Sequence, residues 1–320
     1  MVLAPMADVT DAAFRRVIAR YGKPDVFWTE FVSADGLTRA NPKGKVKLEK
    51  DLIYIEGERP IVAQFFTSNP ESMFDAALIA GRLGFDGIDI NMGCPDRAIE
   101  KQGAGAAMIK NPKRAREIIR AARDGAKKGA GKEVPISVKT RLGYNKDELD
   151  IWLPEILAEE PAVVTIHART RKEMSKVPAR WERVTRAVEI RNSLQKEMKN
   201  KTLIFGNGDV FGLHDAIEKG KESGADGVML GRAIFGNPWL FSGRTDISIR
   251  EKLEVLAEHT KLFEEILGDV KNFSVMKKHY KAYVHGWEGA KELRSRLMST
   301  NTAKEVKIIV SDYIDTLCLY

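Results

Sequence analysis

Short, almost uniformly apolar runs recur along most of the chain. A strand of a parallel sheet is buried on both faces, so it reads as a continuous apolar run and does not alternate with polar residues. We therefore predict strands at residues 2–6, 25–31, 60–66, 86–91, 134–139, 162–167, 202–206 and 226–230.

Helices are predicted between these runs, because apolar residues there return every three or four positions. One helix, with Phe14 on its buried face, follows the first run, and Thr10 is expected to cap it. Another covers about 70–83, with Ser68 or Asn69 as its cap. Strand, helix and parallel strand form a right-handed crossover, and eight such units match the size of a (β/α)8 barrel.

A doubly wound sheet also alternates strands with helices. A dinucleotide-binding sheet would carry Gly-x-Gly-x-x-Gly after its first strand, and none follows here. The predicted fold class is therefore α/β, a (β/α)8 TIM barrel. The strand pattern stops after Trp239, and residues 248–319 carry only helical spacing. We predict a barrel domain over 1–243 and a small C-terminal all-helical domain over 244–320.

Composition and charge favour a protein without a membrane span, in a reducing compartment, with a polyanionic partner. The 320 residues are 43% hydrophobic and 30% charged, enough for one large core and a smaller second one, and no apolar run is long enough to cross a bilayer. The two cysteines, Cys94 and Cys318, lie far apart with no secretory leader, which predicts a reducing, cytoplasmic compartment. The net charge of +7 favours a polyanionic partner, although many enzymes are mildly basic without one.

The carboxyl ends of the predicted strands carry polar or small residues on every strand. In a barrel these ends form one rim, where enzymes of this fold place their chemistry, and a purely structural barrel would not require such residues there. The rim residues are Pro5, Met6, Glu30, Gln64, Asn91, Cys94, Lys139, Arg141, His167, Arg169, Asn207 to Asp209, Gly231 and Arg232.

Two glycine-containing loops follow the seventh and eighth predicted strands, at 206–209 and 230–233. Barrels commonly bind a phosphate with these two loops, because glycine lets backbone N–H groups approach the anion. Arg232 would add a bidentate charged contact. Two ordinary glycine turns are the alternative, but their position in these two loops favours phosphate binding.

The loop after the fourth predicted strand reads Asn-Met-Gly-Cys-Pro over 91–95. Pro95 pushes the preceding residue toward extended geometry, so Cys94 is expected on a turn. A lone cysteine beside a strand is more often a small buried hydrophobic residue than a catalyst. Cys94 alone therefore does not decide between packing and catalysis.

Four further polar residues are expected near this turn. Lys139 could simply extend to the surface, and His167 could be a hydrogen-bonded core imidazole. With Gln64 and Asn91 they form a polar pocket suited to a heteroaromatic ring above a phosphate site, which fits a phosphorylated planar cofactor. No His-x-His or Cys-x-x-Cys spacing is present, so no metal is expected.

Several short motifs occur in a fixed order along the barrel. They are Ala-Pro-Met at 4–6 with Val-Thr-Asp at 9–11, Asn-Met-Gly-Cys-Pro at 91–95, Gly-Ala-Gly-Ala at 103–106, Val-Lys-Thr-Arg-Leu-Gly at 138–143, His-Ala-Arg-Thr-Arg at 167–171, Gly-Asn-Gly-Asp at 206–209, and Gly-Arg-Ala at 231–233 with Asn-Pro-Trp at 237–239. This series resembles that of the tRNA-dihydrouridine synthases, and the helical tail resembles that family's RNA-binding domain.

The resemblance implies reduction of specific uridines in tRNA to 5,6-dihydrouridine, with FMN as cofactor and NADPH as electron donor. Hydride would pass from flavin N5 to uracil C6, and the Cys94 thiol would give the proton to C5. The uridine would leave its stack to reach the flavin. The residues implied for FMN are Ala4, Pro5, Met6, Gln64, Lys139, His167, Asn207, Gly208, Asp209, Gly231 and Arg232.

A second set is implied for the tRNA. Lysines of the tail interleave with Tyr280 and Tyr283, which suits phosphate contacts combined with aromatic stacking, although such a run is usually a solvated helix face. We expect a monomer, without a membrane or metal partner. The residues implied for the tRNA are Asn91, Arg141, Arg169, Arg171, Lys277, Lys278 and Lys281.

Two other functions are weighed against this one. A flavin-dependent reductase of a free pyrimidine or enone would need no basic tail, and a non-enzymatic RNA-binding protein would leave Gly208, Gly231 and Arg232 unexplained. The sequence also departs from the family at 173–178, where Glu-Met-Ser-Lys-Val-Pro replaces the usual Tyr-Ser-Gly. The resemblance therefore does not predict the shape of the loop 172–180.

Overall fold

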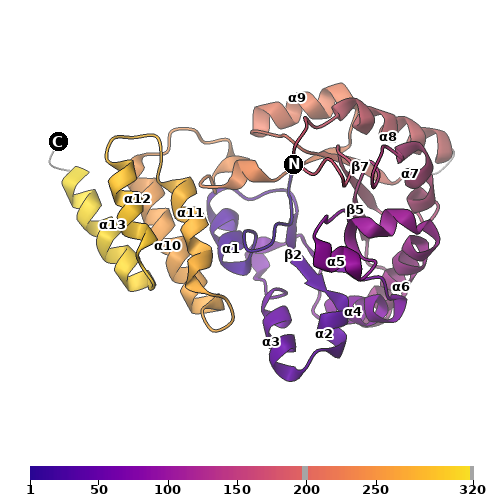
Figure 1. The fold of residues 1–320 in the computed structure, drawn as a ribbon, viewed down its shortest axis with the longest axis horizontal. Helices are drawn as coiled ribbons and strands as arrows, with labels where there is room; N and C mark the ends of the chain where they lie inside the picture. Colours follow the sequence, from indigo (N-terminus) through magenta and orange to yellow (C-terminus); the bar gives the residue numbers. More distant parts are fainter. Residues whose placement is uncertain (197–200, 318–320) are drawn as a thin grey trace.

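The computed structural model describes residues 1–196 and 201–317, and Cys318 lies outside them (Figure 1). Its strands are parallel and adjacent in sequence order, from β2 through β8 to β1, so the sheet curls into a nearly closed barrel. The predicted TIM-barrel fold is confirmed. The strands are β1 (Val2–Leu3), β2 (Phe27–Ser33), β3 (Ile61–Phe66), β4 (Gly87–Met92), β5 (Ile136–Arg141), β6 (Val163–His167), β7 (Leu203–Asn207) and β8 (Gly227–Leu230).

Helices surround the barrel and continue beyond it, where the C-terminal helices lie beside α1 (Figure 1). The barrel helices are α1 (Ala12–Tyr21), α2 (Ala34–Arg39), α3 (Pro42–Lys50), α4 (Pro70–Arg82), α5 (Arg97–Lys101), α6 (Pro112–Ala130), α7 (Leu149–Leu157), α8 (Trp181–Leu194) and α9 (Leu213–Ser223). The C-terminal helices are α10 (Ile249–Leu267), α11 (Met276–Tyr283), α12 (Ala290–Met298) and α13 (Ala303–Leu317). Within the described residues, no helix is both long and apolar enough to span a membrane.

Of the two helix N-caps predicted from the sequence, one is wrong and one is confirmed. Thr10 is the wrong cap for α1, because the Asp11 side chain accepts the Phe14 N–H at 3.0 Å. Thr10 instead accepts the Met6 N–H at 2.9 Å, which closes the turn before the helix. Asn69, one of the two residues predicted to cap α4, is confirmed, since its side chain accepts from the first turn of that helix.

One continuous hydrophobic cluster includes buried residues of both the barrel and the C-terminal helices. At the junction, Phe14 of α1 stacks on His259 of α10 with ring centroids 4.6 Å apart, and His279 of α11 meets both rings edge-on. The helical part is therefore packed firmly on the barrel. We propose residues 243 and 244 as the boundary, because a short 3-10 helix ends at Gly243 and α10 starts only after Ser248.

Candidate active site

A cavity of about 530 Å³ opens at the carboxyl ends of the strands, as expected for this fold. Of the residues implied for FMN, all except Gln64 line it. The lining residues are Ala4, Pro5, Met6, Lys139, His167, Arg169, Ser175, Asn207, Gly208, Asp209, Val210, Phe211, Met229, Gly231, Arg232 and Ala233.

Gln64 lies in a buried polar network beside the cavity. Its side-chain amide donates to Asp89, and its oxygen accepts from the Asn91 amide at 3.1 Å. Ser137 donates to the other oxygen of Asp89. Burial raises the pKa of Asp89 to about 6, while the hydrogen bonds from Gln64 and Ser137 act against this rise. The sequence analysis missed Asp89 and Ser137.

This network ends at the cysteine turn. Asn91 Oδ1 accepts the backbone N–H groups of Gly93 at 3.1 Å and Cys94 at 2.9 Å. The Cys94 carbonyl accepts the Ala106 N–H at 2.9 Å. A Cβ at Gly105, whose φ is +60°, would lie 2.7 Å from that carbonyl, so the turn requires glycine there. Cys94 therefore sits on a turn that is fixed from both sides.

The Cys94 thiol is half-buried. Burial raises its pKa above the ordinary thiol value, while a hydrogen bond from the Asp96 backbone acts against this rise. The thiol is therefore protonated at neutral pH. A protonated thiol can act as an acid but is a poor nucleophile.

Lys139 and His167 differ in charge, because only the Lys139 amine stays mostly protonated at neutral pH. Burial, helped by the nearby Arg141, lowers the pKa of Lys139 to about 8, and burial with the same cationic neighbours lowers the pKa of His167 well below its ordinary value. Lys139 Nζ donates to Asn207 Oδ1 at 3.3 Å, and Asn207 donates to the Met229 carbonyl at 2.8 Å. The site thus offers one mostly protonated amine, with a lowered pKa, beside a neutral imidazole.

The glycine loops differ in how tightly they are built. Gly208 has φ +119°, and a Cβ there would lie 3.0 Å from Ala179 and 3.1 Å from the His167 ring. Gly231 would accept a Cβ at ordinary contact distances. Arg232 is largely exposed and pairs with Asp209 at 2.8 Å. Asp209 also binds Arg169, so its carboxylate orients two guanidinium groups at the rim.

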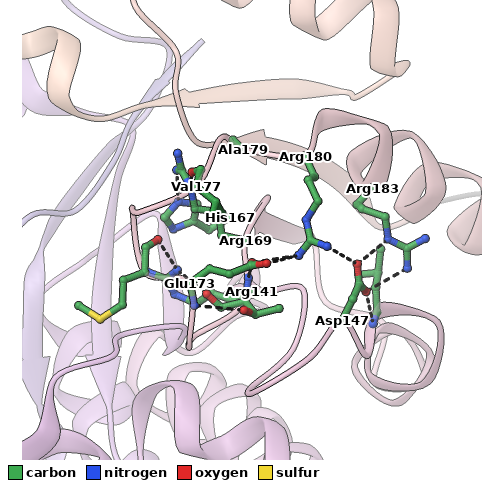
Figure 2. Close-up of polar contacts among 12 residues, drawn as sticks. Arg141, Asp147, His167, Arg169, Glu173, Val177, Ala179, Arg180 and Arg183 are labelled. Atoms are coloured by element: carbon green, nitrogen blue, oxygen red, sulfur yellow. Dashed lines mark hydrogen bonds and ion pairs between the residues drawn. The ribbon is translucent and has the colours of Figure 1, made fainter.

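Arg141 is buried, and within residues 1–196 and 201–317 its hydrogen bonds all go to carbonyl groups. Figure 2 shows those on the side of the loop after β6. Its Nε contacts the Gly93 carbonyl at 2.7 Å, and its Nη1 contacts the carbonyls of Thr170 and Met174, each at 3.2 Å. Burial lowers the pKa of Arg141 to about 10. This side chain thus joins the cysteine turn to the loop after β6.

Further arginines fix the loop 172–180, whose shape the resemblance did not predict. Arg169 donates to the Val177 carbonyl at 2.6 Å, and Arg180 pairs with Glu173 at 2.9 Å (Figure 2). Arg183 extends this chain to Asp147 of the neighbouring loop at 2.8 Å (Figure 2). Charged groups on both sides therefore hold the loop over the cavity edge.

Arg171 points to another part of the rim. Its guanidinium binds both carboxylate oxygens of Glu100 and lies 5.2 Å from the centre of the Tyr144 ring. Lys110 lies over the same ring at 4.3 Å. Arg171 is therefore already paired with a carboxylate.

The tail combines the predicted lysines with tyrosines that face inward. Tyr280 and Tyr283 are only 0% and 1% exposed, so the prediction that they stack on bases is wrong. Their three-residue spacing places both on the core face of α11, and sequence spacing alone does not separate a core face from a stacking face. Lys281 is exposed, while Lys277 and Lys278 are half-buried.

Across residues 1–196 and 201–317, no group of three or more His, Cys, Asp or Glu side chains is arranged to hold a metal ion.

Comparisons with known proteins agree with the fold and the motifs. Residues 2–317 match the family described as dihydrouridine synthase. The chain is 38% identical over 315 residues to a probable tRNA-dihydrouridine synthase of Staphylococcus aureus (strain MRSA252), covering 98% of this chain and 92% of that one. It is equally identical, over the same length, to probable tRNA-dihydrouridine synthase 2 of Bacillus subtilis (strain 168), covering 98% and 93%.

Solved structures support the fold alone. Histamine dehydrogenase from Rhizobium sp. 4-9 matches with a TM-score of 0.52 at 12% identity, over 87% of this chain and 50% of that one. The 6-hydroxypseudooxynicotine amine oxidase of Pseudomonas geniculata N1 matches with a TM-score of 0.51 at 13% identity, over 89% and 53%. This chain thus spans about half the length of each.

Proposed function

Since the chain belongs to the dihydrouridine synthase family, we propose that it reduces uridines in tRNA to 5,6-dihydrouridine, using FMN that is reduced by NADPH. The observation that carries this proposal is the placement of Cys94. A protonated thiol stands on a rigid turn at the carboxyl end of β4, on the face of the barrel that holds the cavity.

The cavity fits a flavin in size and chemistry. Its volume of about 530 Å³ lies within the usual range of cofactor pockets, roughly 300–1,000 Å³. Lys139 and the neutral His167 would face the polar edge of the ring system. The Gly208 loop, with Gly231 and Arg232 beside it, would receive the phosphate. We propose that Asp209 acts by orienting Arg169 and Arg232, because its carboxylate would repel a phosphate.

When bound, the flavin would supply hydride chemistry at C6 of the uracil. The chain's own residues do the rest: the Cys94 thiol holds the proton for C5, and Asn91 fixes the backbone on which that thiol stands. Gln64 acts through Asn91, since its oxygen accepts one hydrogen of the Asn91 amide. The other hydrogen of that amide, for which the described residues show no acceptor, would donate to a uracil carbonyl.

The RNA around the target would meet the arginines of the rim. Arg141, Arg169 and Arg171 would lie nearest the uracil and its flanking phosphates, and the tail lysines would contact the tRNA backbone farther away. With tRNA as substrate, we also propose a cytoplasmic location.

The direct test uses purified protein and tRNA that lacks modifications. The protein should be yellow as isolated or after addition of FMN, and with NADPH it should form dihydrouridine, detected by mass spectrometry of tRNA digests. A protein that binds no flavin, or that reduces free uridine but not tRNA, would contradict the proposal.

A further inference from the structure

The cavity has one edge formed by a tight turn between β1 and α1. Pro5 and Met6 line the cavity. The Met6 carbonyl accepts the N–H groups of Val9 at 3.1 Å and Thr10 at 3.0 Å, so residues 6–10 form a compact unit. Asp8 in this turn has φ +53°, a left-handed conformation that is uncommon for a residue other than glycine. Asp tolerates this region better than most residues, and contacts from outside the turn can select it.

Glu30 of β2 holds the Asp8 backbone. One carboxylate oxygen of Glu30 accepts the Asp8 N–H, and the other accepts from Lys271 Nζ at 2.6 Å. Both side chains of the Glu30–Lys271 pair are almost fully buried. Glu30 thus lies directly between the turn at the cavity and a lysine.

That lysine comes from the helical domain. Lys271 follows α10, and its Nζ also lies 3.2 Å from Asp51 and 3.5 Å from Asp8. It therefore joins acidic groups from three separate segments of the barrel. Burial raises the pKa of Glu30 to about 7, and Lys271 acts against this rise. Removing the lysine would leave buried carboxylates without their cation, which is far more costly than never having had the pair.

We propose that Lys271 is a positioning residue through which the helical domain sets the conformation of the turn at residues 6–10, and with it the affinity of the cavity for its cofactor. That the cofactor is FMN rests on the function proposed above. Since coupling between two equilibria is reciprocal, FMN binding should in turn tighten the docking of the helical domain on the barrel.

The first measurement does not need the flavin. Lys271→Met keeps the length of the side chain and removes its charge. Amide hydrogen exchange of residues 6–10 in the flavin-free protein should become faster, while exchange in β4 and β5 stays unchanged. Unchanged protection of residues 6–10 would overturn the proposal.

The second measurement is an FMN titration. Lys271→Met should weaken FMN binding by about 5- to 150-fold, the usual range for coupled sites. The increase in melting temperature on adding FMN should shrink as well. A lysine that only stabilises the fold would lower the melting temperature with and without FMN alike, and an unchanged FMN affinity would contradict the coupling.

Two further variants test whether the effect comes from the Lys271 contact itself: one should restore the turn, and the other is a control. Glu30→Gln, combined with Lys271→Met, keeps an oxygen for the Asp8 N–H and needs no cation, so the double variant should regain much of the lost protection. Glu258→Gln is the matched control. Glu258 of α10 binds Arg20 and Tyr21 of α1, and so joins the same two domains without touching the turn.

The control separates the coupling from general loosening of the domains. Glu258→Gln should lower the melting temperature but leave exchange at residues 6–10 and FMN affinity unchanged. If it loosens the turn as much as Lys271→Met does, docking in general, and not Lys271, holds the turn. If the parent protein binds no FMN, the proposed function fails, while the exchange data still decide the role of Lys271.

Discussion

Replacing Cys94 by alanine tests the residue on which the proposed function depends. The change removes one sulfur atom and leaves the Cβ. The contacts that hold the turn use the backbone of residue 94, since its N–H donates to Asn91 and its carbonyl accepts from Ala106. Because the thiol is only half-buried, its loss should destabilise the fold by no more than about 1 kcal/mol.

The effect on catalysis should be much larger. Removing a positioned acid slows proton transfer by about 10²–10⁴. This corresponds to an increase of about 3–5 kcal/mol in the activation free energy of that step. Anaerobic stopped-flow at the flavin absorbance separates the two half-reactions. NADPH should bleach the flavin of Cys94→Ala at the parent rate, because that step uses no thiol, and only re-oxidation by tRNA should slow.

The pH dependence supplies an independent check. Because burial raises the thiol pKa, the parent should keep its proton donor through the neutral range. The rate of re-oxidation by tRNA should then fall as the pH rises through that raised pKa, since the donor loses its proton, and Cys94→Ala should lack this fall. If the variant reduces tRNA as fast as the parent, the thiol is a packing group and another donor is required.

Three further changes test other parts of the molecule. Arg232→Ala should weaken FMN binding by roughly tenfold. This is the lower end of the range for a charged hydrogen bond, because the Arg232 side chain is largely exposed. A full flavin content after dialysis would mean that the phosphate binds elsewhere. Charge reversal at Lys277 and Lys281 should lower the slope of log Kd for tRNA against log salt by about 0.7–0.9 per lost contact, and an unchanged slope would make both lysines solvating groups. His259 and His279 are buried where the C-terminal helices meet α1, and burial lowers the pKa of His279 to about 3 and that of His259 well below its ordinary value. The unfolded chain therefore binds more protons below about pH 6.5, and the free energy of unfolding, measured in urea, should fall with decreasing pH by up to about 1.4 kcal/mol per pH unit for each histidine. His259→Phe should reduce that slope, and an unchanged slope would contradict the assignment.

The barrel could be predicted from the sequence because most strand positions are apolar and buried, and helical spacing separates the strands. Boundaries were less accurate. β2 and β5 begin two residues later than predicted, at Phe27 and Ile136. At β5 the cause is local, since Pro135 has no N–H to donate and the ladder can start only after it. These shifts do not move the candidate site residues, since Lys139, for example, still lies near the carboxyl end of its strand.

The cavity lining could be predicted where its residues lie at, or just after, the carboxyl end of a strand, as Lys139 and Gly231 do. It was not predictable where partners come from distant segments. Asp89 lies inside an apolar strand, and Lys271 lies in a loop of the tail, and neither has a local motif. Their roles arise from contacts with Gln64 and Glu30, which only the folded chain brings into reach. The prediction that the tyrosines of α11 stack on bases was wrong for the same reason, since their spacing does not reveal which helix face the rest of the protein covers.

We propose that Arg141, together with the Lys139 amine, supplies positive charge toward the substrate. Arg169 is paired with Asp209, and Arg171 with Glu100. In the described part of the chain, no carboxylate lies within ion-pair distance of Arg141, whose contacts are all carbonyl groups. Under the proposed function, hydride addition at C6 places negative charge on the uracil before the proton reaches C5. An uncompensated, rigidly held guanidinium in a buried site stabilises such charge more than a paired one does. Under this proposal Arg141 would combine two roles, because the carbonyl contacts that join it to the loop after β6 would also hold its charge in place.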